Sequence, residues 1–130
     1  MPRPVEPILE LETLLAIRAL VKSAYGDIIS VYPKRIARIC YLKESPHYLF
    51  MIGKILRIIE EMDIGLYRAE TQYRQVYLLP LKSCLARIVM DTLTGIYELA
   101  NDIRRTRSHH MSKGRMYSYD RNYGNKAITL

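Results

Sequence analysis

The chain has 130 residues, of which 49% are hydrophobic and 25% charged, and its formal net charge is +7. This length allows one domain with one hydrophobic core. The first residues, MPRPVEP, lack the basic start and apolar stretch of a signal peptide, and no apolar run reaches the roughly 18 residues of a membrane span. We therefore expect a cytoplasmic protein without a membrane-spanning segment.

Helical periodicity dominates the first part of the chain. Residues 7–24 place apolar side chains on one face, which predicts an amphipathic helix ended by the turn at 25–27. Residues 28–32 are short and rich in β-branched side chains, which predicts a strand. A second helix is expected over 33–42, because proline is favoured in the first turn. Its outward face carries three cations, Lys34, Arg35 and Arg38.

A third helix is predicted over 46–62, with Ser45 as its N-cap. It is apolar nearly all the way round, and helices of this kind are usually buried on more than one side. We therefore expect it to have a second partner, such as another subunit. Its expected core face is Leu49, Ile52, Leu56 and Ile59. The expected outward face is His47, Phe50, Met51, Lys54 and Arg57.

The stretch after this helix does not follow a helical period. Gly65 is suited to the left-handed turn that ends a helix. Residues 66–71 and 75–79 are rich in Tyr, Val, Thr and Leu, and they flank a polar tip that contains Tyr73 and Arg74. This pattern predicts a β-hairpin, and the absence of an Asn-Gly pair predicts a longer loop at its tip. A second cation, Arg68, lies on the first strand of the hairpin.

A single long helix is predicted over 81–107. Its apolar residues step by four and three positions alternately, with Thr92 as the one weak position, which is a heptad-like pattern. Two interpretations are open: a helix packed across its own domain, or a seam between two subunits. In the second interpretation the dimer interface consists of Leu85, Val89, Ile96, Leu99 and Ile103.

The C-terminal region carries most of the excess positive charge. Residues 1–103 contain 13 Lys/Arg and 12 Asp/Glu, whereas residues 104–130 contain seven and one. From residue 108 onward the chain is polar, without apolar period, and rich in Tyr and Gly. We therefore divide the chain into a domain, 1–107, and a basic tail, 108–130, which we expect to be disordered when unbound. Such asymmetry is typical of an arm that meets polyanions.

The sequence contains no pattern of catalytic or metal-binding residues. A nucleophile elbow, a P-loop and a dinucleotide fingerprint are absent. The pair His109-His110 has no Cys or acid spaced to complete a metal site. Cys40 and Cys84 fall on apolar helical faces, which predicts two buried thiols; a disulfide is an option only in a source that keeps intracellular disulfides. We expect no enzyme activity, no cofactor and no metal.

The order of these elements resembles the winged helix-turn-helix superfamily. The resemblance rests on the second helix, the turn Lys43-Glu44-Ser45-Pro46, the third helix, and the sequence MDIGLYR that leads into the hairpin. It implies a mainly α fold with a small β-hairpin, the wing, a recognition helix at 46–62, and a long C-terminal helix followed by a flexible basic tail. The closing helix also looks like those that pair subunits in archaeal and bacterial regulators of this class.

This resemblance implies a homodimeric DNA-binding protein, either a transcription regulator or a chromatin-associated factor. The start of the recognition helix is poor in Asn, Gln, Ser and Arg, which departs from the usual pattern of base-reading residues. One alternative is a ribosome-associated or other ribonucleoprotein component that binds RNA through its tail. Another is a winged-helix module that binds only protein, through Phe50 and Met51. The predicted nucleic-acid contacts are Lys34, Arg35, Arg38, His47, Lys54, Arg57, Arg68, Tyr73, Arg74, Arg104, Arg105, Arg107, Lys113 and Arg115.

Overall fold

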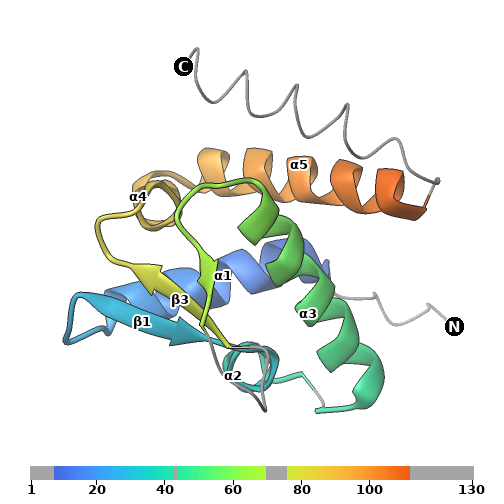
Figure 1. Cartoon of the computed structure of the whole chain (residues 1–130), viewed down its shortest axis with the longest axis horizontal. Helices are drawn as coiled ribbons and strands as arrows, with labels where there is room; N and C mark the ends of the chain where they lie inside the picture. The colour runs from blue at the N-terminus through green and yellow to red at the C-terminus, as the bar shows by residue number, and fades with distance from the viewer. Residues whose placement is uncertain (1–7, 43, 70–75, 112–130) are drawn as a thin grey trace, which may run out of the picture.

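A computed structural model describes residues 8–42, 44–69 and 76–111 of the chain, with the side chains of 109–111 left out. This part of the chain is mainly helical and contains a small antiparallel sheet, as predicted (Figure 1). The elements are, in order, α1 (Leu9–Lys22), β1 (Ile28–Val31), α2 (Pro33–Ile39), α3 (Pro46–Glu61), β2 (Tyr67–Arg68), β3 (Tyr77–Pro80), α4 (Cys84–Asp91) and α5 (Leu93–Met111).

The sheet has the strand order β1-β3-β2, and both pairings are antiparallel. Strand β1 pairs with β3 from Ile28 opposite Pro80 to Val31 opposite Tyr77. The predicted hairpin is present, but β2 spans two residues rather than the expected 66–71. Alternate side chains of β1 and β3 are buried, as the two-residue period of a strand requires. The hairpin tip, with Tyr73 and Arg74, lies outside the described residues.

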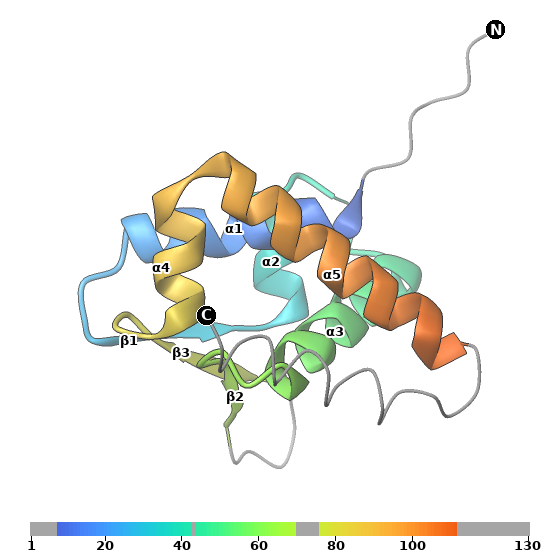
Figure 2. The same ribbon diagram turned by 90° about the horizontal axis from the view of Figure 1, so that it is seen from above.

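Helix α1 lies at the centre of the fold, because it contacts each of the other four described helices. Figure 2 shows α5 lying across α1 and α3. The largest fully buried side chains come from all five described helices and from β3: Leu14, Ile17, Ile36, Ile52, Ile55, Leu56, Ile59, Tyr77, Leu79, Leu85, Ile96 and Ile103. None of the described helices is both long and apolar enough to cross a bilayer.

Helix α3 is buried by the rest of its own chain. The expected core residues Ile52, Leu56 and Ile59 are fully buried, and Leu49 is half-buried. Ile55 and Ile58, which we assigned to other faces of the helix, are also buried. Helices α1, α2 and α5 pack around α3 and account for this burial. Another subunit is therefore not needed to explain the apolar sequence of α3.

Short local signals fix where several helices begin. Ser45 caps α3 as predicted, since its side chain accepts a hydrogen bond from the Tyr48 amide at 3.3 Å. Helix α3 ends with Asp63 in the left-handed region, at a φ of 58°, and not at Gly65 as predicted; Gly65 follows with a φ of 114°, which is unfavourable for other residues. A Cβ atom at this position would lie 2.3 Å from the Cβ of Ser83, so glycine is also needed for close packing against the start of α4.

The prediction of one continuous helix over 81–107 is wrong. The chain forms two helices, α4 and α5, separated at Thr92, whose backbone is extended. The Thr92 hydroxyl accepts a hydrogen bond from the Gly95 amide at 3.1 Å and so serves as an N-terminal cap for α5. Helix α5 continues to Met111. The expected boundary at residue 107 therefore falls inside a helix, and the part of the expected tail after residue 111 lies outside the described residues.

The heptad-like residues do not form a surface seam. All five are buried in the core of the single chain, with exposed fractions between 0% and 4%: Leu85, Val89, Ile96, Leu99 and Ile103. The change of direction at Thr92 lets both α4 and α5 pack against α1. These positions therefore follow the first interpretation, a helical region packed within its own domain. Association of two copies through another surface stays a prediction.

Candidate nucleic-acid interface

One face of α3 is exposed to solvent. It carries His47, Phe50, Lys54 and Arg57, while Met51, expected on the same face, is half-buried. The Lys54 ammonium lies 5.0 Å from the centre of the Phe50 ring, a distance suited to a cation–π interaction. Arg57 lies 3.8 Å from the Glu61 carboxylate, one turn further along the helix. Both cations are therefore held loosely, by contacts that water screens.

The three cations predicted on α2 have different environments. Lys34 is exposed. Arg35 is half-buried and donates hydrogen bonds to the backbone carbonyl and the hydroxyl of Ser30, at 2.9 and 3.1 Å, which ties α2 to β1. Arg38 is exposed and its Nε lies 2.7 Å from the Glu44 carboxylate. Because α2 packs against α3, its two exposed basic residues lie on a helix that neighbours α3.

Arg68 connects the hairpin to the end of α3. Its guanidinium donates a hydrogen bond to the Tyr77 hydroxyl at 3.4 Å and lies 3.8 Å from the Glu60 carboxylate. The pKa of Arg68 is raised by the hydrogen bond with Tyr77 and then by the charge of Glu60. The backbone N–H of Arg68 also donates to Glu60. These contacts place a permanent cation beside the carboxyl end of α3.

The three arginines near the end of α5 lie in different surroundings. Arg104 is exposed, and its side chain has no hydrogen bond or ion pair with another described residue. Arg105 lies 3.8 Å from Asp102 on the same helix. Arg107 lies 2.8 Å from the carboxylate of Glu10, which is 4% exposed. The expectation that Arg107 contacts nucleic acid is therefore not favoured, since its side chain is directed into the molecule by a buried acid.

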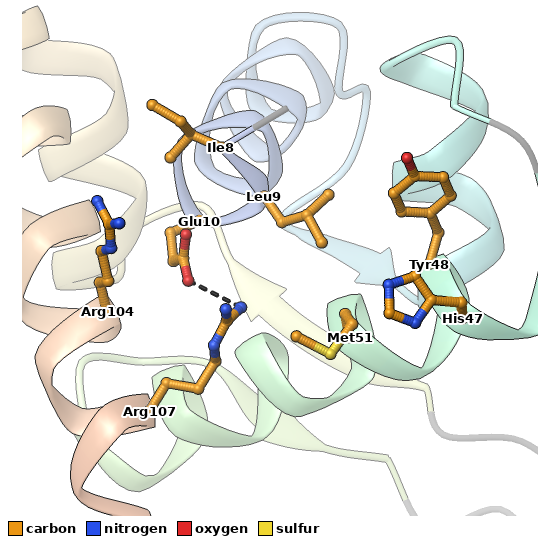
Figure 3. A pocket seen from close by; sticks show the side chains of 8 residues that line it. All are labelled: Ile8, Leu9, Glu10, His47, Tyr48, Met51, Arg104 and Arg107. Carbon is orange, nitrogen blue, oxygen red and sulfur yellow. Dashed lines mark ion pairs between the residues drawn. The ribbon is translucent and has the colours of Figure 1, made fainter. Parts of the chain in front are cut away.

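A pocket of about 380 Å³ lies between the start of α1, the start of α3 and the second half of α5 (Figure 3). Arg107 reaches across it to Glu10, while His47, Tyr48 and Met51 come from α3 on the opposite side. This site does not follow from the sequence patterns described above. One signal was present: Glu10 stands one and two turns before the core residues Leu14 and Ile17, so a charged residue occupies a position in register with the core.

The two cysteines differ in exposure, and the expectation of two buried thiols is wrong for Cys84. Cys84 begins α4 and is exposed. Cys40 is half-buried, and its thiol donates to the backbone carbonyl of Glu12 at 3.3 Å. Burial, followed by the charge of Glu12, raises the pKa of Cys40 to about 12. Cys40 therefore stays protonated at neutral pH and is not a nucleophile. Both thiols are free.

Four predicted contact residues cannot be placed: Tyr73, Arg74, Lys113 and Arg115 lie outside the described residues. Among the others, the structure brings the cations of α2, α3 and β2 onto neighbouring elements, and it places Arg104 and Arg107 around a pocket that His47 also lines. Comparisons of the chain with protein-family models, with curated proteins and with solved structures find no match. The functional inference therefore rests on the residues described above.

Proposed function

We propose that this protein binds double-stranded DNA in the manner of a winged helix-turn-helix protein, as a transcription regulator or a chromatin-associated factor. Helix α3 is the recognition helix and the β2–β3 hairpin is the wing. The observation that carries the proposal is the exposed basic face of α3, together with the order of the elements along the chain and the strand order β1-β3-β2. That order sets a hairpin directly after α3 and a basic helix, α2, directly before it.

The dimensions and charges of α3 suit a major groove. Its 16 residues give a length of roughly 24 Å, and the groove of B-DNA is wide enough to admit one helix. Lys54 and Arg57 are three residues apart and therefore share a face of the helix. Their present contacts, a phenyl ring and a carboxylate at 3.8 Å, are weak at an exposed surface. Either cation can exchange such a contact for a phosphate at little cost.

The same face predicts modest sequence selectivity. Discrimination between bases depends on side chains that make paired hydrogen bonds to base edges, such as Arg, Asn and Gln. On the exposed face of α3 the first cation after His47 is Lys54, two turns along the helix. Contacts to phosphates fix the position of a protein on DNA but carry no sequence information. We therefore expect most of the affinity to come from phosphate contacts.

RNA binding is a second candidate function, favoured by the distribution of charge. Within the described part of the chain, Arg38, Arg57, Arg68, Arg105 and Arg107 each lie within 4 Å of an acidic side chain. The residues from 108 onward carry four cations and one acid, interspersed with tyrosines that could stack on unpaired bases. A protein that used mainly this region would bind single-stranded RNA with little contribution from α3.

Fluorescence anisotropy over a series of salt concentrations tests the proposal. The probe is a short DNA duplex, with a single-stranded RNA of equal length in parallel. We expect the double variant Lys54→Ala/Arg57→Ala to bind duplex DNA with a salt slope lower by about two, since each phosphate contact contributes roughly 0.9. Lys82→Ala/Arg87→Ala is the matched control, because it removes the same charge from two exposed residues at the start of α4 that are not among the predicted nucleic-acid contacts.

The outcomes separate the two candidates. A reduced slope for the α3 variant alone supports DNA binding through α3. Equal slopes for the α3 variant and the α4 control would contradict it. Retention of RNA in preference to duplex, with no change in the α3 variant, would support the RNA candidate instead. Circular dichroism of each variant checks that these exposed substitutions leave the fold intact.

A further inference from the structure

The pocket between α1, α3 and α5 combines a buried ion pair, an unpaired cation and apolar walls. Glu10 and Arg107 form the ion pair, and Arg104 stands one turn before Arg107 at the rim (Figure 3). The apolar part of the lining consists of Ile8, Leu9, Tyr48 and Met51. The volume, about 380 Å³, is at the small end of the range for sites that hold small molecules.

The two facing atoms of the buried ion pair serve as each other's partners. Apart from their mutual contact at 2.8 Å, the buried atoms Glu10 Oε2 and Arg107 Nη1 have no hydrogen-bond partner among the described residues. Buried polar atoms in proteins are nearly always hydrogen-bonded, and the exceptions need an explanation. Glu10 Oε2 and Arg107 Nη1 meet this need through each other, and because both atoms are closed to solvent a ligand in the pocket would not reach them.

Charge selects the sign of that ligand. The carboxylate of Glu10 is compensated by Arg107, so the pair is neutral as a unit. Arg104, which is exposed and unpaired among the described residues, is then the excess charge of the pocket, and His47 lines the opposite side. An arginine fork binds carboxylate and phosphate groups with paired hydrogen bonds. The site therefore favours an anionic group near Arg104.

We propose that this pocket binds a small organic anion, whose carboxylate or phosphate group contacts Arg104 and whose apolar body lies against Leu9, Tyr48 and Met51. Leu9 belongs to α1 and Met51 to α3, so apolar side chains line the pocket from two elements, beside the polar groups of the same lining. An inorganic anion would not cover these apolar side chains, which would stay in contact with water. A nucleic-acid backbone has no apolar group to place against them. The combination of one unpaired arginine and an apolar portion of the lining points to a molecule that carries both an anionic group and a small apolar body.

Binding of four probes to the full chain, without nucleic acid, tests this proposal. Benzoate and phenyl phosphate carry an anion and an apolar body, inorganic phosphate lacks the body, and benzyl alcohol lacks the charge. We expect benzoate or phenyl phosphate to raise the unfolding temperature at concentrations up to about 10 mM, and isothermal calorimetry gives the dissociation constant. A response to benzoate alone identifies a carboxylate ligand, and one to phenyl phosphate alone identifies a phosphate ester.

The variant Arg104→Met decides whether the response comes from this pocket. We expect it to weaken binding of the responding probe at least tenfold, since a charge-assisted hydrogen bond is lost. Arg105→Met is the matched control, because Arg105 has the same charge on the next position of α5 and lies 3.8 Å from Asp102 instead of lining the pocket. The control should bind as the unmodified protein does.

Three results would overturn the proposal. The first is that neither organic anion binds. The second is that inorganic phosphate or benzyl alcohol binds as tightly as the organic anions. This would show that the pocket does not need a ligand with both a charge and an apolar body. The third is an equal loss of binding for Arg104→Met and Arg105→Met. Because no nucleic acid is present, each of these results is independent of whether α3 binds DNA.

Discussion

Two ion pairs of nearly equal length stand in different regions of the molecule. Arg107 lies 2.8 Å from Glu10 where α5 meets α1, and Arg38 lies 2.7 Å from Glu44 beyond the end of α2. Their side chains are 27% and 5% exposed in the first pair and 64% and 40% exposed in the second. Judged by distance alone, the two ion pairs would be equally strong. Their different burial makes them unequal.

The difference shows which cations of this protein are available to a partner. An exposed ion pair contributes at most about 1 kcal/mol, because water competes with both partners. Breaking a buried pair leaves a charge without water or counter-charge and costs about 3–5 kcal/mol. Arg38 can therefore exchange Glu44 for a phosphate, whereas Arg107 is committed to Glu10. The same reasoning places Lys54 and Arg57 with Arg38, in the region suited to nucleic acid.

The two cysteines offer a similar comparison between a shielded and an exposed group. The difference in their rates of alkylation is the largest effect that we expect. With a pKa raised to about 12, native Cys40 should react with iodoacetamide on the order of 10³-fold more slowly at pH 8 than it does in the unfolded protein, because its thiolate is suppressed. Exposed Cys84 should react rapidly in the native protein. The single-cysteine variants Cys84→Ser and Cys40→Ser separate the two rates, which mass spectrometry measures.

The same shift fixes the direction of a pH effect on stability. The folded state favours the neutral thiol of Cys40, so this contribution is fully present below the ordinary thiol pKa of about 9 and is lost as the pH rises toward 12. Rapid alkylation of native Cys40 at pH 8 would show that the thiol is not shielded by α1. It would also contradict the half-buried position of the thiol against the Glu12 carbonyl.

Substitution of Arg107 tests the buried pair directly. Arg107→Met should lower the free energy of unfolding by about 3 kcal/mol, because Glu10 would remain as an uncompensated charge in the core. Urea unfolding followed by circular dichroism measures the change. The double variant Glu10→Gln/Arg107→Met removes both charges and should recover much of the loss. If the single and double variants are equally destabilised, the lost contribution is packing rather than charge.

Local signals explain which parts of the fold could be predicted from the sequence. The start of α3 follows from Ser45 and the proline after it, since both lie within one turn of chain, whereas the left-handed end of α3 falls at Asp63 and not at the predicted Gly65. The strand at 28–31 follows from its β-branched residues, but its pairing with β3 joins distant segments and is not encoded locally. Local sequence signals therefore predict these elements, whereas the order of the strands in the sheet is seen only in the structure.

The missed features depend on long-range contacts. The apolar pattern continues through Thr92 because the residues on both sides face the same core, and a periodic pattern does not distinguish a continuous helix from two helices that share a buried side. Likewise, Glu10 and Arg107 lie near opposite ends of the described chain, and only the packing of α5 on α1 brings them together. The pocket beside them was therefore beyond the reach of local sequence patterns.

The smallest expected effect on stability is the sharpest test of the comparison. Arg38→Met removes the shorter of the two ion pairs, yet it should lower the free energy of unfolding by less than about 1 kcal/mol, because both partners are well exposed. Under the proposed function the same variant should reduce the salt slope of DNA binding by about 0.9, since one phosphate contact is lost. The measurements are urea unfolding and anisotropy, on one protein preparation. A stability loss as large as that of Arg107→Met would mean that distance, and not burial, decides the strength of these pairs. In that case Arg38 would be held too firmly by Glu44 to serve a nucleic acid.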